Sequence, residues 1–136
     1  MREFLVPLVV VLFVALAAVS CGGGDSPSSP TPAPTPGPTP NPMTATITIT
    51  STGASPRSVT IAAGGRVTFT NNDSRTHEMN SDPHPEHTTC PAINDVGFLS
   101  VGQSKTTGNL NTVRTCGFHD HNQPSNTSLT GTIVIQ

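Results

Sequence analysis

Seven side chains of the kinds that bind metals stand close together in the C-terminal half of this sequence. They are five histidines and two cysteines, in a chain with a single lysine. Imidazole and thiolate ligands together suit copper or zinc, and Cu(II) binds most tightly among the divalent first-row ions. The sequence therefore favours a copper site. The candidate ligands are His77, His84, His87, His119, His121, Cys90 and Cys116.

The two cysteines leave two interpretations open. A His–Cys–His set forms a trigonal copper site, in which one of the two cysteines would act as a thiolate. An exported domain with two cysteines more often pairs them. A Cys90–Cys116 disulfide would close a loop of about 27 residues and stabilise the fold by roughly 3–4 kcal/mol. Cys116 would then be unable to bind copper, and His84 and His87 could complete a site made of histidines alone.

The remaining candidates differ in what surrounds them. His119 and His121 flank Asp120, and alternate residues of an extended chain point the same way. One imidazole can bind the metal directly while the other lies behind the ligands without binding the metal, or both can bind the metal in a type 2 copper centre. Asp120 could orient an imidazole through its second nitrogen. His84 and His87 stand in a polar, proline-rich stretch, so each taken singly is expected to be solvated, with a second ion as an alternative role.

The elements that must position these residues are short β-strands. Alternating apolar and β-branched residues predict strands, and Gly, Asn and Asp separate them. Two polar stretches, 78–94 and 117–128, are predicted to be long loops, which are often functional in a compact domain. Together these features predict an all-β, antiparallel β-sandwich. The predicted strands are 44–50, 59–61, 66–70, a short strand ending at 106, 111–115 and 131–136.

The N-terminal part is predicted to be a targeting segment and a tether. Residues 1–20 read as a secretory signal peptide, because their apolar run of about 16 residues is shorter than the roughly 20 that cross a bilayer. Ala18-Val19-Ser20-Cys21 resembles a bacterial lipobox, which implies lipidation at Cys21; an ordinary cleaved signal is the alternative. Residues 21–42, rich in Pro, Ser and Thr, are predicted to be a disordered, extended linker. We therefore expect an exported, lipid-anchored protein of the cell envelope, on the periplasmic or outer face.

Residues 43–136 are enough for one small domain with one core. The net charge of −2 and the lack of a basic patch argue against nucleic-acid binding. No nucleophile motif, phosphate loop or carboxylate pair stands out, so an enzyme is not predicted.

This domain resembles plastocyanin-like cupredoxins along nearly its whole length. The segment 56–73 is similar to their strand–turn–strand, with His77 at the place of the histidine ligand that follows it. Thr115-Cys116-Gly117-Phe118-His119 resembles their Cys-x-x-His ligand loop, and 131–135 their closing strand. The resemblance implies a Greek-key sandwich holding one copper ion that cycles between Cu(I) and Cu(II). Its ligands would be His77, Cys116 and one of His119 or His121.

The sequence departs from that family pattern near its C-terminus. Leu129 stands where the axial methionine is expected, which leaves Gln123 and Met79 as candidate substitutes. Met79 would share the face of His77, which stands two residues before it in the same strand. The loop that leads to Gly131 is also several residues longer than the pattern.

Three functions follow as hypotheses. The first is an envelope electron carrier with a His/Cys/His copper site and a protein redox partner. The second is a copper-binding or delivery protein with a histidine-only site, a Cys90–Cys116 disulfide and a copper-handling partner. The third is a β-sandwich interaction module that binds no metal.

Overall fold

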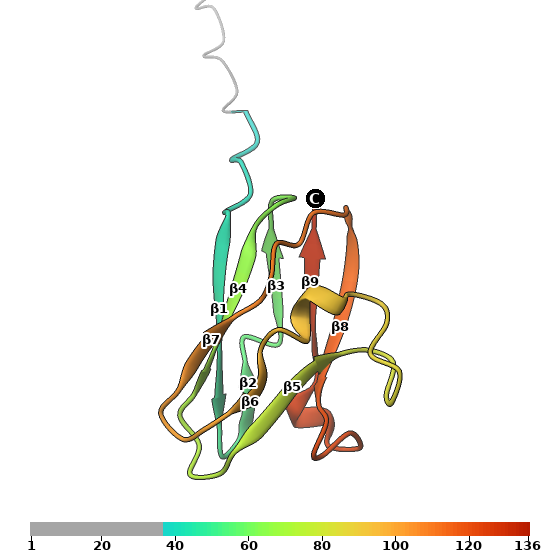
Figure 1. The fold of residues 1–136 in the computed structure, drawn as a ribbon. Helices are drawn as coiled ribbons and strands as arrows, with labels where there is room; N and C mark the ends of the chain where they lie inside the picture. Colours follow the sequence, from blue (N-terminus) through green and yellow to red (C-terminus); the bar gives the residue numbers. More distant parts are fainter. Residues whose placement is uncertain (1–36) are drawn as a thin grey trace, which may run out of the picture. The chain divides into compact units, whose positions relative to one another are not determined.

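Alternating apolar side chains assemble two β-sheets face to face in the computed structural model, which describes residues 37–136 (Figure 1). One sheet has the order β2-β1-β4-β7 and the other has the order β3-β9-β8-β5-β6. Two short 3₁₀ helices, η1 (Pro91–Ile93) and η2 (Thr127–Leu129), lie in the connections. The strands are β1 (Thr44–Thr50), β2 (Gly53–Ser55), β3 (Ser58–Ile61), β4 (Arg66–Asn71), β5 (His77–Ser81), β6 (Gly97–Leu99), β7 (Ser104–Thr106), β8 (Arg114–Asp120) and β9 (Gly131–Ile135).

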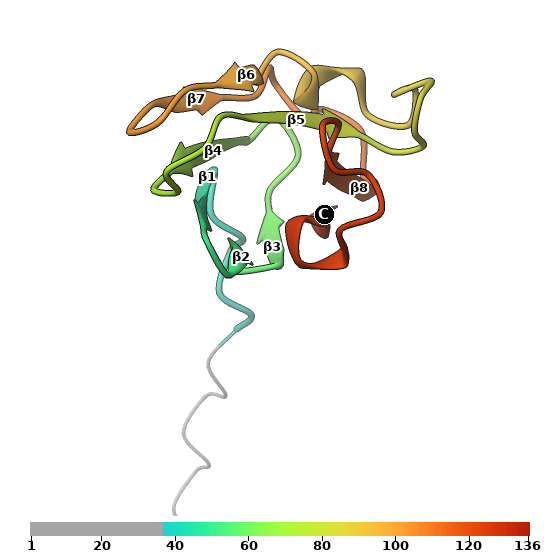
Figure 2. The ribbon, with the colours of Figure 1, turned by 90° about the horizontal axis from the view of Figure 1, so that it is seen from below.

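The predicted β-sandwich is confirmed, but the expectation of purely antiparallel sheets is corrected, because both sheets are mixed. Strand β1 runs parallel to β4, and β3 runs parallel to β9. Every other pairing between named strands of residues 37–136 is antiparallel. Figure 2 shows the two layers from below, with β1, β2 and β4 on one side and β8 on the other.

The core lies between the sheets because each strand turns every second residue inward. Ile47 and Ile49 of β1 are fully buried, whereas Thr48 between them faces outward. Phe69 of β4 meets Phe118 of β8 edge to face, with ring centroids 5.2 Å apart, and joins the two layers. Such an aromatic contact adds about 0.5–1.5 kcal/mol to the area that the rings bury.

Two strands extend into the stretches that the sequence predicts to be loops. Strand β5 occupies the start of 78–94, and β8 continues through Asp120 instead of ending near residue 115. Hydrophobic patterning misses both strands because polar residues take inward positions in them. His77 and Asp120 are fully buried on the core side, where they bond to each other. Strands β2 and β6, three residues each, are also absent from the predicted set.

Within residues 37–136, no helix is long and apolar enough to cross a membrane. The predicted signal peptide, Cys21 and the linker up to residue 36 lie outside the described residues.

Candidate metal centre

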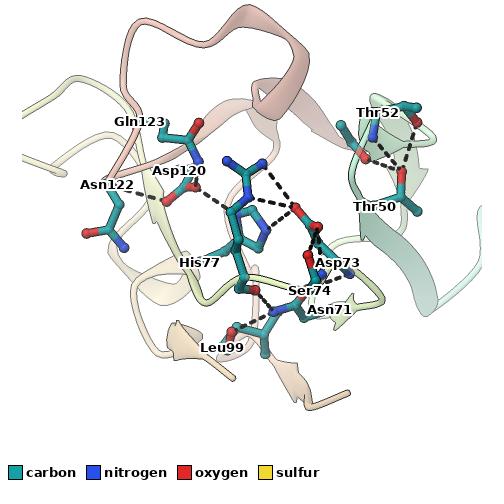
Figure 3. Close-up of polar contacts among 12 residues, drawn as sticks. Thr50, Thr52, Asn71, Asp73, Ser74, His77, Leu99, Asp120, Asn122 and Gln123 are labelled. Carbon is teal, nitrogen blue, oxygen red and sulfur yellow. Dashed lines mark hydrogen bonds and ion pairs between the residues drawn. The ribbon is translucent and has the colours of Figure 1, made fainter. Parts of the chain in front are cut away.

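His77 is enclosed in the sandwich core by two carboxylates (Figure 3). Its Nδ1 lies 2.8 Å from Oδ2 of Asp120, and its Nε2 lies 3.2 Å from Oδ2 of Asp73. Ionised carboxylates only accept hydrogen bonds, so this geometry matches a ring that donates from both nitrogens. No ring nitrogen of His77 is left to bind a metal.

Further polar contacts hold both carboxylates in place. Asp73 accepts a hydrogen bond from the backbone N–H of Ser74 at 2.6 Å and forms an ion pair with Arg75 at 3.1 Å. Burial acts to raise the pKa of Asp73, but these two contacts and His77 together lower that pKa below its ordinary value. Asp120 accepts from the backbone N–H of Glu78 at 3.0 Å. We call Asp73, Arg75, His77 and Asp120 the buried ion network.

Cys90 and Cys116 form a disulfide, with Cα atoms 5.8 Å apart. Of the two interpretations that the sequence leaves open, the structure contains the disulfide. Cys116 lies in the middle of β8, fully buried and opposite Ile133 of β9. Because its sulfur is bonded to Cys90, Cys116 cannot supply a thiolate, and neither cysteine is available to copper.

The alternation of β8 separates the residues that the His77–Cys116 hypothesis brings together. Asp120 pairs with Met79 on the core side of the sheet, whereas His119 pairs with Asn80 on the opposite side. Residues directly opposite each other in an antiparallel pair share a face. His77 and His119 therefore lie on opposite faces of the sheet. The expected site of His77, Cys116 and His119 or His121 is corrected on this point, because β8 continues four residues beyond Cys116.

The other named candidates lie near His77. Met79 is fully buried and, as expected, shares the core side with His77. The side-chain nitrogen of Gln123 lies 3.5 Å from Oδ2 of Asp120. Both residues therefore border the buried ion network, of which Asp120 is a member.

Four histidines converge instead on the outer side of the sheet. One ring nitrogen from each of His84, His87, His119 and His121 lies within 4.8 Å of the others. The ring centroids of the pairs in contact are 4.8–5.7 Å apart. His119 comes from β8 and His121 follows that strand, whereas His84 and His87 lie in the loop after β5. We call these residues the four-histidine group; metal binding by them remains a prediction.

The loop that carries His84 and His87 is attached to the sheet at both ends. At its start, the backbone N–H of Asp82 donates to the carbonyl of Gly117 at 3.0 Å. At its end, Cys90 is bonded to Cys116 of the same strand. Figures 1 and 2 show this loop in yellow beside β8. The disulfide and the strand pairing thus bring the loop histidines to the strand histidines.

Within the loop, His87 is held by its own backbone. Its N–H donates to the carbonyl of Pro83 at 2.7 Å, and its carbonyl accepts from the Asn94 side chain at 2.9 Å. Its φ of 53° lies in the left-handed region, which is sparsely populated by residues other than glycine. Such backbone strain persists where the surrounding contacts over-determine it, and it often accompanies function.

The ring nitrogens of this group are arranged differently from those of His77. Nδ1 of His119 lies 2.6 Å from Oδ1 of Asp82, but its buried Nε2 has no hydrogen-bond partner within residues 37–136. Nδ1 of His121 lies 3.1 Å from Nε2 of His87. A buried polar atom without a partner is costly, and a bound ion is one way to satisfy it. These donor atoms therefore fit a metal.

Electrostatics keep His87 suited to that role. Burial and then the neighbouring imidazoles of His119, His121 and His84 lower the pKa of His87, while Glu78 acts to raise it. A histidine must be neutral to bind a metal, so the net shift keeps its lone pair available. The arrangement offers four imidazoles and no thiolate, a set that suits zinc or copper.

No protein-family model and no curated protein matches this sequence. Solved structures do match. The oxidised plastocyanin of Dryopteris crassirhizoma is 20% identical with a TM-score of 0.53, and the match covers 67% of this chain and 99% of that one. A purple cupredoxin from Nitrosopumilus maritimus is 20% identical with a TM-score of 0.53, covering 68% and 99%. A Cu(I) amicyanin mutant is 14% identical with a TM-score of 0.52, covering 67% and 80%. The domain therefore has a cupredoxin-like fold.

Proposed function

We propose that this cupredoxin-like domain holds one copper ion through its four-histidine group, as an exported copper-binding or delivery protein. The observation that carries the proposal is the convergence of four imidazoles, together with the buried Nε2 of His119, which has no hydrogen-bond partner among residues 37–136. Support for copper comes from the donor set and from the fold, since the amicyanin mutant among the structural neighbours is a Cu(I) form.

The expected role of each member of the four-histidine group follows from its position in the fold. His119 and His121 are presented by a paired strand and its end, so they form the fixed half of the site. His84 and His87 come from the attached loop and close the site over them. When bound, copper supplies a redox-active cation, but the four-histidine group offers it no thiolate. The electron-carrier hypothesis, which uses Cys116 as a ligand, is therefore less well supported than copper holding.

The exposure of His84 supports a delivery role. His84 is solvent-exposed, whereas His119 is 3% exposed. A ligand at the surface can be displaced first, so an incoming protein with its own copper ligands could take the ion from that side. We propose that the partner is a copper-handling protein of the cell envelope, and that the predicted lipid anchor keeps the domain there.

Titration of the disulfide-containing protein with Cu(II) tests this function. We expect saturable binding at one ion per chain, and an electron-spin-resonance signal split by several nitrogens. Without a thiolate ligand, only weak visible absorption is expected. An intense visible thiolate-to-copper band, or the absence of saturable binding, would contradict the proposal; the second result would favour the interaction module.

Single substitutions test which residues bind the ion. His121→Ala should weaken Cu(II) binding by at least about tenfold, because loss of a residue that only hydrogen-bonds a metal ligand already weakens binding by that much. Asn122→Ala is the matched control, since Asn122 is the exposed next residue. Equal affinities of the two variants would remove His121 from the site.

A further inference from the structure

We infer that Asp82 is a positioning residue of the four-histidine group and that Gly117 provides the space in which it acts. The inference rests on the proposed metal-binding function and deepens it. Asp82 selects which nitrogen of His119 is free to bind the ion, and it does so without touching the ion itself.

The contact between Asp82 and His119 fixes the tautomer of the ring. Oδ1 of Asp82 lies 2.6 Å from Nδ1 of His119. An ionised carboxylate only accepts a hydrogen bond, so the proton of the neutral imidazole stays on Nδ1. Nε2 then carries the lone pair, and this buried atom has no hydrogen-bond partner in the described part of the chain. Metal-binding histidines typically donate their second N–H to a carboxylate in this way.

Asp82 reaches His119 because position 117 has no side chain. Its backbone N–H bonds to the carbonyl of Gly117, so the Asp82 side chain starts directly beside β8. A Cβ atom built on Gly117 would overlap the Asp82 carboxylate, and its three nearest atoms all belong to the Asp82 side chain. Gly117 is not among the described residues with positive φ, so its backbone would accept alanine. What glycine supplies here is space.

This contact is poorly suited to a purely structural role. The side chain of Asp82 is 48% exposed, and that of His119 is 4% exposed. Pairs that water reaches contribute little to stability. We therefore expect the loss of Asp82 to change metal affinity much more than it changes the free energy of unfolding.

Substitution of Asp82 is the first test. Asp82→Ala in the full disulfide-containing domain should weaken Cu(II) binding by about 10–100-fold, the range typical of such outer partners. In the metal-free protein, nitrogen-15 NMR should show His119 protonated on Nδ1, and this preference should be lost in the variant. Glu86→Ala removes the same charge from an exposed position of the same loop and should change neither quantity.

A double-mutant cycle tests the role of Gly117. Gly117→Ala should weaken Cu(II) binding in the wild-type background, because the new methyl group displaces the carboxylate. In the Asp82→Ala background the same change should have little effect, since the overlapping atoms are gone. Equal effects of Gly117→Ala in both backgrounds would overturn the inference.

The outcomes separate this inference from the proposed function. If the wild type binds copper and Asp82→Ala binds it equally well, positioning by Asp82 is wrong and the copper site stands. If the wild type binds no copper, the proposed function fails. The tautomer of His119 then decides the inference. If His119 has the same tautomer in the wild type and in Asp82→Ala, the inference is overturned; if the preference for Nδ1 protonation is lost in the variant, the inference is supported.

Discussion

Two buried histidines differ in how many ring nitrogens the protein occupies. Both nitrogens of His77 face carboxylates of the buried ion network, whereas only one nitrogen of His119 has a protein partner within residues 37–136. A histidine with both nitrogens occupied is a structural cross-link. One with a single nitrogen occupied is oriented and still able to bind a metal. The same residue type is therefore bonded differently on the two sides of one sheet.

Loss of His77 should reduce stability and leave copper binding unchanged. His77→Ala would leave the Asp120 carboxylate unpaired in the core, and breaking a buried pair in this way costs about 3–5 kcal/mol. Urea unfolding measures the loss, and Cu(II) titration of the folded variant measures the affinity. His77→Gln, which fills more of the space and can still donate one bond, should lose less. A weakened copper affinity of folded His77→Gln would return His77 to the metal site.

The lowered pKa of Asp73 makes stability depend on acid. Because the pKa is lower in the folded state, this carboxylate adds stability above its unfolded pKa of about 3.9. That stability is lost as the pH falls through the folded pKa. Asp73→Asn should therefore unfold more readily than the wild type at pH 7, and the gap should narrow below about pH 4.

Urea unfolding at several pH values checks the Asp73 prediction. Asp95→Asn, at an exposed position, serves as the control for a change of net charge. A stability gap between Asp73→Asn and the wild type that stays constant from neutral pH into acid would show that Asp73 does not titrate as inferred.

Strand β8 and the loop after β5 together decide where the site lies. β8 supplies inward residues to the core and outward residues to the four-histidine group, so its length sets which histidines can meet. The loop supplies the other two histidines and depends on its attachments to β8, because it has few apolar side chains of its own. Chain order alone did not indicate that these two elements adjoin.

Removal of the disulfide should therefore affect both stability and binding. The double variant Cys90→Ala/Cys116→Ala loses a cross-link over a sequence separation of 26 residues. We expect the free energy of unfolding to fall by about 3–4 kcal/mol. Copper affinity should fall as well, because the loop that carries His84 and His87 loses one of its two attachments. An unchanged Cu(II) affinity in the folded variant would show that the backbone contact of Asp82 holds the loop alone.

For the molecule as a whole, we propose export and attachment to a membrane through a lipid on Cys21. This proposal comes from the lipobox-like sequence and the proline-rich tether, both mostly outside the described residues. In a bacterial host, Cys21→Ser should move the protein from the membrane fraction to the soluble envelope fraction, without changing copper binding by the domain. Cell fractionation with immunoblotting checks this. A variant that stays in the membrane fraction would contradict lipid anchoring.

The sequence by itself predicts the sandwich, because alternating apolar residues define the two inner faces, and 44–50, 66–70 and 131–136 become strands as expected. It also identifies the candidate histidine ligands and the two possible states of the cysteines, a Cys116 thiolate ligand or a Cys90–Cys116 disulfide. Only the tertiary structure decides between those states and selects the histidines that converge. The reason is that β8 continues through Asp120, and each residue added to a strand is assigned to one face of the sheet in alternation. A hydrophobic pattern does not detect this longer strand, because polar residues such as His77 and Asp120 occupy inward positions of β5 and β8.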